Sequence, residues 1–470
     1  MTSGLTFAQT GQTLRNLTVA VGAANAVRLA SDLVVEGTTT LTSGTLDISN
    51  VDLTIGGALT GAGQIATNAT SGLTINTIGG LSTPLQFTGG TIGDLTTNIG
   101  QAGSITLGSD LIVANMLDLN SGTLILNGND LTIVGGLASE GVGTISSTAT
   151  SSINILSGAV TAGRLAFDAA ANTVNDLTIA VGSGNVVNLT SAANIVGDLT
   201  LTSGRLDIAN NILAIASTGT IVGGNATSFI QTGVAGAVSM VVNAGASAAT
   251  VFPVGTATGF FPANISLQPG SGSGTVNVGA ITGVFAQGTT GSLISDTEAS
   301  VNNTWNISSN IASNLRMNME LAWQAAAEVN GFNRTQAYIS HYTNSAWDAN
   351  ATGAASVRAD GMYSLQRSDV QSLSPFAIFD GTTSDVASEV ASNYNVYPSP
   401  ATDVVVIESL VNASAPTTID IVDAQGRIVA SSVMMPGGSH IISVNALSTG
   451  VYFIKLHNAS SVTTKSFIKI

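Results

Sequence analysis

The sequence predicts an all-β protein: a right-handed β-solenoid of about three 80-residue repeats, followed by a β domain and a C-terminal Ig-like β-sandwich. Three observations support this prediction. Short runs such as Leu46-Asp47-Ile48 alternate apolar and polar residues, which is the period of a strand with one wet face. Gly, Asn, Asp and Ser interrupt these runs every 6 to 12 residues, and helical spacing of apolar residues is absent. The first half of the chain also repeats itself.

The repeat is marked by a Ser-Gly-x-Leu motif that begins at Ser43, Ser121 and Ser203. The first two copies are 78 residues apart and the next two are 82 apart, so the unit is about 80 residues long. The repeats span residues 1–235, with units near residues 5–84, 85–164 and 165–235.

The composition of the repeats favours a solenoid. Their inward positions are nearly all Val, Ile and Leu, as expected for rungs that stack in columns. Thr, Ser and Asn occupy the outward positions, and glycine is frequent where a coil must turn. At roughly 20 to 27 residues per coil, each unit would supply three to four coils, which gives a rod of about ten. Three tandem β-sandwich domains remain the alternative.

Residues 236–382 break the repeat and predict a separate β-rich globular domain, because prolines stand beside aromatic residues and all three tryptophans occur there. Trp305, Trp323, Trp347 and Tyr342 could form a stacking platform for a sugar ring, or they could be the core of this domain. Residues 383–393 are small and polar and predict an exposed linker, where we expect proteolytic removal of the tail.

The tail, residues 394–470, contains all three lysines of the chain and predicts a compact antiparallel sandwich. Two prolines hold an extended entry, and Asp423 to Arg427 predicts a hairpin turn between β-branched runs. The residues that make up its ordered motifs are Pro398, Pro400, Asp423, Gly426, Arg427, Gly450, Tyr452, Lys455, Lys465 and Lys469.

These motifs resemble the type A C-terminal sorting domain of proteins that the type IX secretion system of Bacteroidota exports, over roughly the last 75 to 80 residues. Ser399 stands where the family more often has Asn. The resemblance implies recognition by the translocon and its outer-membrane shuttle barrel, and removal of the tail by a sortase-like protease. It also implies either attachment to anionic lipopolysaccharide or release. The repeats resemble those of β-solenoid adhesins.

Composition limits the remaining function classes. The net charge is −15, of which residues 1–234 carry −9, residues 235–391 carry −6 and residues 392–470 carry none, which argues against nucleic acid as a partner. The chain has no cysteine, so a disulfide framework is excluded. No apolar run approaches the roughly 18 to 20 residues of a membrane-spanning helix. The first residues lack the pattern of a signal peptide, so we expect a mature form or part of a longer precursor.

Few residues suit catalysis. Of the three histidines only His341 precedes the tail, where we expect it to be solvated or locally hydrogen-bonded. Paired carboxylates could act in a glycoside hydrolase, or bind calcium in a polysaccharide lyase. However, Asp47 and Asp207 are equivalent in the repeat while the middle copy has Ile125 there. We therefore predict no catalytic residue, no metal ligand and no cofactor.

Together these patterns predict a non-enzymatic, secreted or surface-anchored structural protein or adhesin, in which a rod of repeats holds a terminal binding domain away from the cell. Its localisation would be extracellular or at the outer-membrane surface. Because the ends of a solenoid present unpaired strand edges, head-to-tail self-association into a filament is a further hypothesis. A solenoid enzyme that degrades polysaccharides, or a glycan-binding module, is the alternative.

Overall fold

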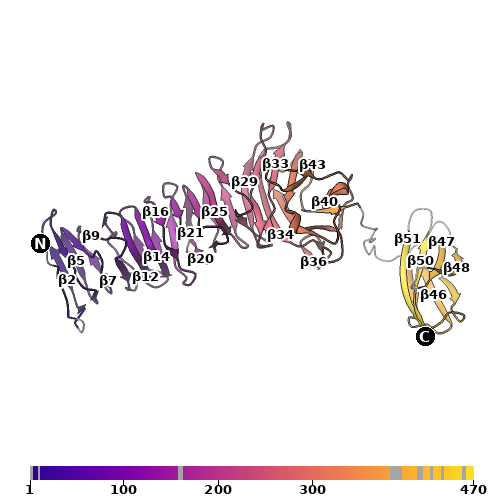
Figure 1. Cartoon of the computed structure of the whole chain (residues 1–470), viewed down its shortest axis with the longest axis horizontal. Helices are drawn as coiled ribbons and strands as arrows, with labels where there is room; N and C mark the ends of the chain where they lie inside the picture. Colours follow the sequence, from indigo (N-terminus) through magenta and orange to yellow (C-terminus); the bar gives the residue numbers. More distant parts are fainter. Residues whose placement is uncertain are drawn as a thin grey trace. The chain divides into compact units, whose positions relative to one another are not determined.

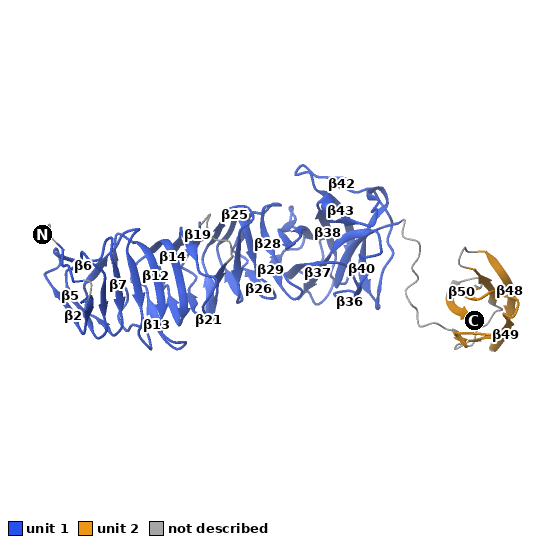
Figure 2. Ribbon diagram, turned by 60° about the horizontal axis from the view of Figure 1, so that its bottom comes forward, with its two compact units in different colours: residues 1–384 blue, residues 385–470 orange. Residues whose placement is uncertain are grey.

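The computed structural model describes residues 4–8, 11–156, 162–381, 394–409, 417–423, 427–435, 439–457 and 462–470. The chain divides into two compact units, residues 1–384 and 385–470, each described by itself below (Figure 2). The predicted linker, residues 383–393, lies outside the described residues. Among the described residues, no helix is both long and apolar enough to cross a membrane.

Residues 13–255 form a β-solenoid of about 11 turns, so the predicted solenoid is confirmed and the alternative of tandem sandwiches is wrong. Figure 1 shows its short strands stacked as successive rungs. The strands of the solenoid are β1 (Thr13–Leu14), β2 (Leu17–Ala20), β3 (Ala26–Arg28), β4 (Leu33–Val35), β5 (Thr39–Ser43), β6 (Thr45–Asp47), β7 (Asp52–Ile55), β8 (Leu59–Thr60), β9 (Gln64–Ala66), β10 (Gly72–Ile75), β11 (Phe87–Thr88), β12 (Thr91–Asn98), β13 (Ser104–Thr106), β14 (Leu111–Ser121), β15 (Thr123–Ile125), β16 (Leu131–Ile133), β17 (Gly136–Leu137), β18 (Thr144–Ser147), β19 (Ile153–Ile155), β20 (Ala162–Leu165), β21 (Phe167–Val174), β22 (Leu177–Ala180), β23 (Val186–Leu189), β24 (Ala193–Ile195), β25 (Asp198–Asp207), β26 (Ile212–Ile215), β27 (Thr220–Gly223), β28 (Ser228–Gln231), β29 (Ala237–Val242) and β31 (Val254–Thr256).

One coil contributes three short strands, which pair in parallel with the coils before and after it. Strands β22, β23 and β24 make up such a coil. They pair in this order with β19, β20 and β21 of the preceding coil. In the next coil, β22 and β23 pair with the first and second halves of the long strand β25, and β24 pairs with β26. Each strand therefore has hydrogen-bonded neighbours on both sides, which satisfies the backbone groups of an interior coil.

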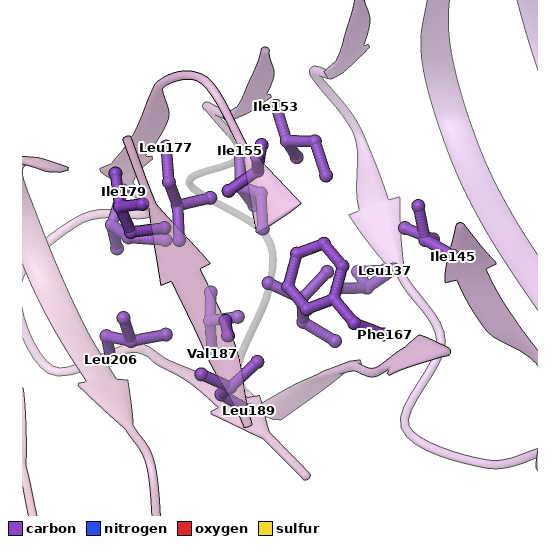
Figure 3. Close-up of a cluster of buried hydrophobic side chains, with 14 of the residues drawn as sticks. Leu137, Ile145, Ile153, Ile155, Phe167, Leu177, Ile179, Val187, Leu189 and Leu206 are labelled. Carbon is purple, nitrogen blue, oxygen red and sulfur yellow. The ribbon is translucent and has the colours of Figure 1, made fainter. Parts of the chain in front are cut away.

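Identical apolar positions of successive coils stack into columns inside the solenoid. One column consists only of leucines in direct register: Leu33, Leu53, Leu73, Leu95, Leu117 and Leu137. The spacing of 20 residues between Leu33 and Leu53 and of 24 between Ile153 and Leu177 gives the coil length. Figure 3 shows Ile153 and Leu177 directed into the same interior as Val187. Stacking like on like removes nearly all of this apolar surface from water, which stabilises the rod.

The Ser-Gly motif that marks the sequence repeat forms the same bulged corner three times. Each serine lies at a register shift between paired strands. Its hydroxyl accepts a hydrogen bond from a glycine amide of the preceding coil, at 3.0 to 3.2 Å, in the pairs Ser43 with Gly22, Ser121 with Gly100 and Ser203 with Gly182. The glycine after the serine has φ of +80° to +85° in all three copies, a conformation that favours glycine. The 80-residue period therefore records a recurring corner rather than a boundary between domains.

Antiparallel strands close the C-terminal end of the solenoid on two of its faces. Strand β29 pairs with β34 (Gly274–Thr282), and β31 pairs with β32 (Gly259–Phe260), both antiparallel. Parallel pairing thus continues beyond residue 235, to β31, and one hydrophobic core runs from the solenoid into the antiparallel sheets. The core does not stop at residue 235 because apolar columns such as Leu206, Ile230 and Val254 continue across it.

The rest of the first unit consists of antiparallel sheets at the end opposite the N-terminus (Figure 1). One sheet extends from β29 through β34, β37, β44 and β40, and a second has the order β30-β33-β38-β43-β42. The elements not yet given are β30 (Thr250–Phe252), β33 (Ala263–Leu267), β35 (Phe285–Gln287), β36 (Thr290–Leu293), β37 (Ser300–Ser309), β38 (Met317–Trp323), η1 (Ala325–Ala327), β39 (Glu328–Val329), η2 (Arg334–Gln336), β40 (Ala337–Thr343), β41 (Ala346–Trp347), β42 (Ser356–Val357), β43 (Tyr363–Val370) and β44 (Pro375–Asp380).

The second unit contains two antiparallel sheets, with the orders β45-β46-β49 and β48-β47-β50-β51. Buried Val, Ile, Leu, Met and aromatic side chains from both sheets form its own core. The predicted all-β tail is therefore confirmed, while its Ig-like topology stays a prediction. Its strands are β45 (Tyr394–Tyr397), β46 (Val404–Ser409), β47 (Thr417–Val422), β48 (Ile428–Met434), β49 (Ser439–Ser443), β50 (Gly450–His457) and β51 (Val462–Lys469).

Candidate functional site

The acidic and basic residues of the predicted hairpin turn in the tail are held together. Strands β47 and β48 pair antiparallel on either side of it. The Asp423 carboxylate accepts hydrogen bonds from the backbone amide of Arg427 at 2.9 Å and from its Nε at 2.8 Å. The same pair forms an ion pair of 2.7 Å, in which the Arg427 side chain remains 79% exposed. Gly426 lies outside the described residues.

The proline segment of the tail is attached to the last strand. Pro398 and Pro400 are exposed, and Ser399 between them accepts a hydrogen bond on its hydroxyl from the Ile468 amide at 3.1 Å. The Ala401 amide donates to the Ile468 carbonyl at 2.7 Å. The first and last motifs of the tail, far apart in sequence, therefore lie side by side. Ser399, the departure from the commoner Asn, still supplies an acceptor at this place.

The remaining tail residues are distributed over β50 and β51. Tyr452 is buried, its ring lies 5.7 Å from the ring of Phe467, and its hydroxyl donates to the Ser448 carbonyl at 3.0 Å. Lys455 is exposed, Lys465 is half-buried and Lys469 is buried. Gly450 begins β50 opposite Lys469. The nine of these residues that the structure describes thus do not converge on one pocket, but lie in the strands and on the surface of a small domain.

The four aromatic residues proposed as a sugar platform are not brought together on the surface. Trp305 and Trp323 are completely buried, and their indole nitrogens donate to the Phe261 carbonyl at 2.9 Å and to Glu328 at 2.8 Å. They belong to the core, which is the other interpretation given above. Tyr342 and Trp347 form a half-buried edge-to-face pair with ring centres 5.4 Å apart. The Trp347 nitrogen donates to the Phe285 carbonyl at 2.8 Å.

A polar cleft lies between β40 and β43, and we call it the His341 cleft. It has a volume of about 450 Å³, and its walls include His341, Asn350, Gln366, Arg367, Ser368 and Gln371. A second cleft, of about 430 Å³, lies between Ser308 to Leu315 and the loop after β43. Both clefts are lined by Gln371 and Ser372. Both volumes fall within the roughly 300 to 1,000 Å³ of typical ligand sites.

A buried histidine forms part of the wall of the His341 cleft. The residue is 5% exposed, and its ring is stacked on Phe376 with centres 4.4 Å apart. Burial, and then the positive charge of Arg367, lower the pKa of His341 despite the opposing effect of Asp348, so the imidazole is neutral at pH 7. Its Nε2 is buried and has no hydrogen-bond partner among the described residues. His341 is therefore buried rather than solvated, and its local hydrogen bond is made by the backbone amide, which donates to Asp348 Oδ1 at 2.6 Å.

An ion pair supports the same cleft. Arg367 donates to both carboxylate oxygens of Asp348, at 2.9 and 2.6 Å, and to the Ile339 carbonyl at 2.9 Å. Burial raises the pKa of Asp348, but the hydrogen bonds from Arg367 and from the His341 amide outweigh it, so its pKa lies below the ordinary value. Sequence reasoning missed this site because its residues come from strands that are distant in the chain. The one signal was a lone histidine in an alternating strand.

Several carboxylates of the solenoid link successive coils by hydrogen bonds along its axis. The Oδ1 of Asp110, Asp130 and Asp176 each accepts a backbone amide of the next coil at 2.7 to 2.9 Å. Asp52 accepts from Gly72, and burial, followed by repulsion from Asp32 and Asp94, raises its pKa. Within the described ranges, no group of three His, Asp or Glu side chains is arranged to hold a metal ion.

The two other predicted carboxylates lie in local hydrogen bonds. Asp47 accepts the Ser49 amide at 2.9 Å and lies 4.0 Å from Arg28. Asp207 accepts from the Gln231 side chain at 2.6 Å. These contacts explain the two aspartates as parts of corners and ladders.

Comparison with known proteins identifies the tail. Residues 395–470 match the family of secretion system C-terminal sorting domains. No curated protein matches the chain. The matched range covers all the tail motifs described above, from the proline segment to Lys469. The chain therefore carries a type IX secretion system C-terminal sorting domain behind a β-solenoid, and it is a protein secreted to the outer surface of the cell or the extracellular space.

Proposed function

We propose that the exported part of this chain is a non-enzymatic attachment protein, in which the solenoid is a stiff rod and the antiparallel sheets carry the binding surface. The observation that carries the proposal is the single hydrophobic core that runs from the first coils into these sheets. A continuous core with parallel hydrogen bonds on every interior coil resists bending between coils. Stiffness here needs neither cysteine nor, within the described residues, a metal cluster.

The order of the parts along the chain determines how far the binding surface lies from an anchor at the C-terminal side. The antiparallel sheets directly precede the sorting domain in sequence. If the protein is anchored through the end exposed after removal of the tail, these sheets lie next to the anchor. The coils near the N-terminus are then farthest from it along the chain. A protein anchored in this way would not hold its binding domain away from the cell, in contrast to the expectation from the sequence; a released protein or another anchor leaves that expectation a prediction.

Processing by the type IX secretion machinery follows from the sorting domain. We propose that the translocon, the outer-membrane shuttle barrel and a sortase-like protease act on this tail, and that anionic lipopolysaccharide is the anchor. The right-handed sense of the solenoid is also part of this proposal, because parallel strand crossovers are right-handed in nearly all proteins.

Head-to-tail self-association is a weaker proposal, since antiparallel strands occupy the C-terminal edge on two faces. It would need another surface of the first unit. Short single rods in electron micrographs at high protein concentration would contradict it.

The experiment compares the full chain with a deletion of residues 395–470, both expressed with the same export leader in a Bacteroidota host. We expect the full chain at the surface or in the medium, and the deletion variant inside the cell. Intact-mass analysis of the exported product should show loss of the tail, with or without an added glycolipid. Export of the deletion variant at the level of the full chain would contradict the assignment. Turnover of any glycan by the exported protein would contradict the non-enzymatic role.

A further inference from the structure

The first coil of the solenoid leaves strand edges open, in the part of the chain that the structure describes. Strands β1, β2 and β3 are each the terminal strand of their sheet, and each pairs with one other strand, which belongs to the next coil. We propose that this N-terminal edge binds an extended, carboxylate-bearing strand of another protein by β-strand addition. The proposal adds a second contact surface to the rod and does not depend on the attachment role given above.

Backbone groups of β1 and β2 are directed outward at this edge. In β1, the carbonyl oxygens on either side of Thr13 accept amides of the next coil, so the N–H and C=O of Thr13 point away from that coil. In β2, the Leu17 amide donates to the next coil at 3.0 Å, so the N–H and C=O of Thr18 point outward in the same way. The outer edge of β3 is already occupied in part by Leu5, whose amide donates to the Arg28 carbonyl at 2.7 Å. An added strand would therefore bond β1 and β2.

The hydrophobic core is open at the same end of the solenoid. Leu5 is 49% exposed, whereas Leu29, its partner in the next coil, is completely buried. Leu14 is half-buried, while its partner Val35 is completely buried. Interior coils cover such side chains from both sides, but among the described residues those of the first coil are covered from one side. An added strand with inward apolar residues would bury this surface, as each coil does for the next.

The charge of this end indicates the chemistry of the partner. Residues 1–31 contain two arginines, Arg15 and Arg28, and no acidic residue, although the whole chain carries a net charge of −15. Arg15 is exposed, and its side chain has no hydrogen bond or ion pair among the described residues. The open edge is therefore a basic end on an acidic rod, which favours an acidic partner. Two such ends from two copies of the chain would repel each other.

The second coil shows how a carboxylate matches these arginines on the inner side. Arg28 is paired in register with Asp47, and its Nε lies 4.0 Å from the Asp47 carboxylate. The parallel register of β1 with β4 places Glu36 next to Arg15. Opposite charges at paired positions of neighbouring strands stabilise a sheet. A strand that adds to the outer side of β1 with a carboxylate beside Arg15 would repeat this arrangement.

The test measures binding of synthetic peptides to the full chain by fluorescence anisotropy, and locates the contact by hydrogen exchange. The acidic peptide has the sequence of residues 31–44, which contain β4 and β5 and so pair with β1 and β2 in the structure. The neutral peptide differs from it by Asp32→Asn and Glu36→Gln. We expect the acidic peptide to bind about threefold more tightly, the effect of one pair of opposite charges, and to protect the amides of residues 12–20 from exchange.

Variants of the chain separate the charge from the strand edge. Arg15→Ala should remove the difference between the two peptides, and Arg15→Glu should bind a peptide with Glu36→Lys more tightly than the acidic one. Thr18→Pro removes the outward N–H of β2 and should weaken binding about tenfold, the value of one hydrogen bond. The control Thr18→Ala keeps this N–H and should leave binding unchanged. Circular dichroism checks folding, and if Thr18→Pro does not fold, Thr13→Pro on β1 replaces it.

Equal affinity for the acidic and neutral peptides would overturn the proposal. So would the absence of binding at millimolar concentration, or protection that lies outside residues 4–28. These outcomes concern the purified chain, whereas the sorting function is tested by export from cells. A negative binding result would therefore leave the sorting function and the rod standing.

Other occupants of the edge give results that also contradict the proposal. Binding of hexagalacturonate that is lost in Arg15→Ala but kept in Thr18→Pro would assign the edge to an anionic polysaccharide. Dimers of the chain alone in sedimentation, lost in Thr18→Pro, would assign it to a second copy. An exported protein with residues before Met1 that protect residues 12–20 without any peptide would assign it to a preceding coil of the same chain.

Discussion

Removal of one whole coil should leave a folded, shorter solenoid. Deletion of residues 177–198 takes out β22, β23 and β24, the three strands of one coil. It joins Asp176 to Leu199, so an aspartate again precedes the first leucine of the coil, as Asp198 does in the wild type. Each column then continues in register: Ile153, which pairs with Leu177 in the wild type, would face Leu199 directly.

The expected magnitudes follow from this geometry. Adjacent parallel strands are about 4.8 Å apart, so the unit should become about 4.8 Å shorter. The deletion removes 22 of the 384 residues in the first unit, so the dependence of its unfolding free energy on denaturant should fall by about 6% if unfolding is cooperative. The loss of stability should be small, because every remaining apolar column stays filled.

A deletion of the same region that breaks the register is the control. Removal of residues 177–187 takes out half a coil and moves the following strands onto the wrong faces. Each displaced Leu or Ile costs about 2 to 5 kcal/mol, and a few of these exceed the roughly 5 to 15 kcal/mol of a typical domain. Small-angle scattering and denaturant unfolding of both variants provide the measurements. A half-coil deletion as stable as the whole-coil deletion, or a whole-coil deletion that does not fold, would refute the register argument.

Further predictions concern single residues. Gly204 has φ +80°, and a Cβ added there would lie 2.4 Å from a valine side chain, so Gly204→Ala should destabilise the first unit by about 2 to 4 kcal/mol. Gly184 has φ +87° but open space around it, so the control Gly184→Ala should cost only about 1 kcal/mol. Chemical denaturation measures both. The folded pKa of His341 is lowered, so the wild type should lose stability as pH falls below about 6.5, where the unfolded chain takes up a proton more readily. His341→Phe should remove this part of the acid dependence of thermal unfolding. The same acid dependence in the variant and the wild type would contradict the prediction. The folded pKa of Asp348 is lowered, so its ionised carboxylate stabilises the protein above about pH 5. Asp348→Asn should lose this whole contribution there. As pH falls below about 4 towards the folded pKa, the wild type loses it too, and urea unfolding at each pH should show the difference between the two proteins disappear.

The coarse architecture could be predicted because its signals are local and repeated. Alternation within short runs determines which side chains of a strand face inward, and the Ser-Gly motif recurs at the same bulged corner. The tail was predictable for another reason. Several of its motifs lie in strands and turns that form between neighbours in sequence, such as the hairpin from β47 to β48.

The closed end and the cleft were not predictable from local patterns. Antiparallel pairing of β29 with β34 joins residues about 35 positions apart, and nothing in either strand distinguishes it from another parallel rung. His341 meets Arg367 only because β40 and β43 belong to two different sheets that pack together. The tryptophans were ambiguous in sequence, since an aromatic ring suits a core and a sugar platform equally well.

The antiparallel strands at one end of the solenoid have a consequence for how such a protein can change its length in evolution. Duplication or loss of a whole coil upstream of β29 leaves the edge that meets β34 unaltered, because every interior rung presents the same register to its neighbour. An addition between β29 and β34 would instead have to displace an existing antiparallel partner. The length of the solenoid and the sheet that closes it can therefore change independently. Related chains should differ in their number of coils while keeping the same closing sheet.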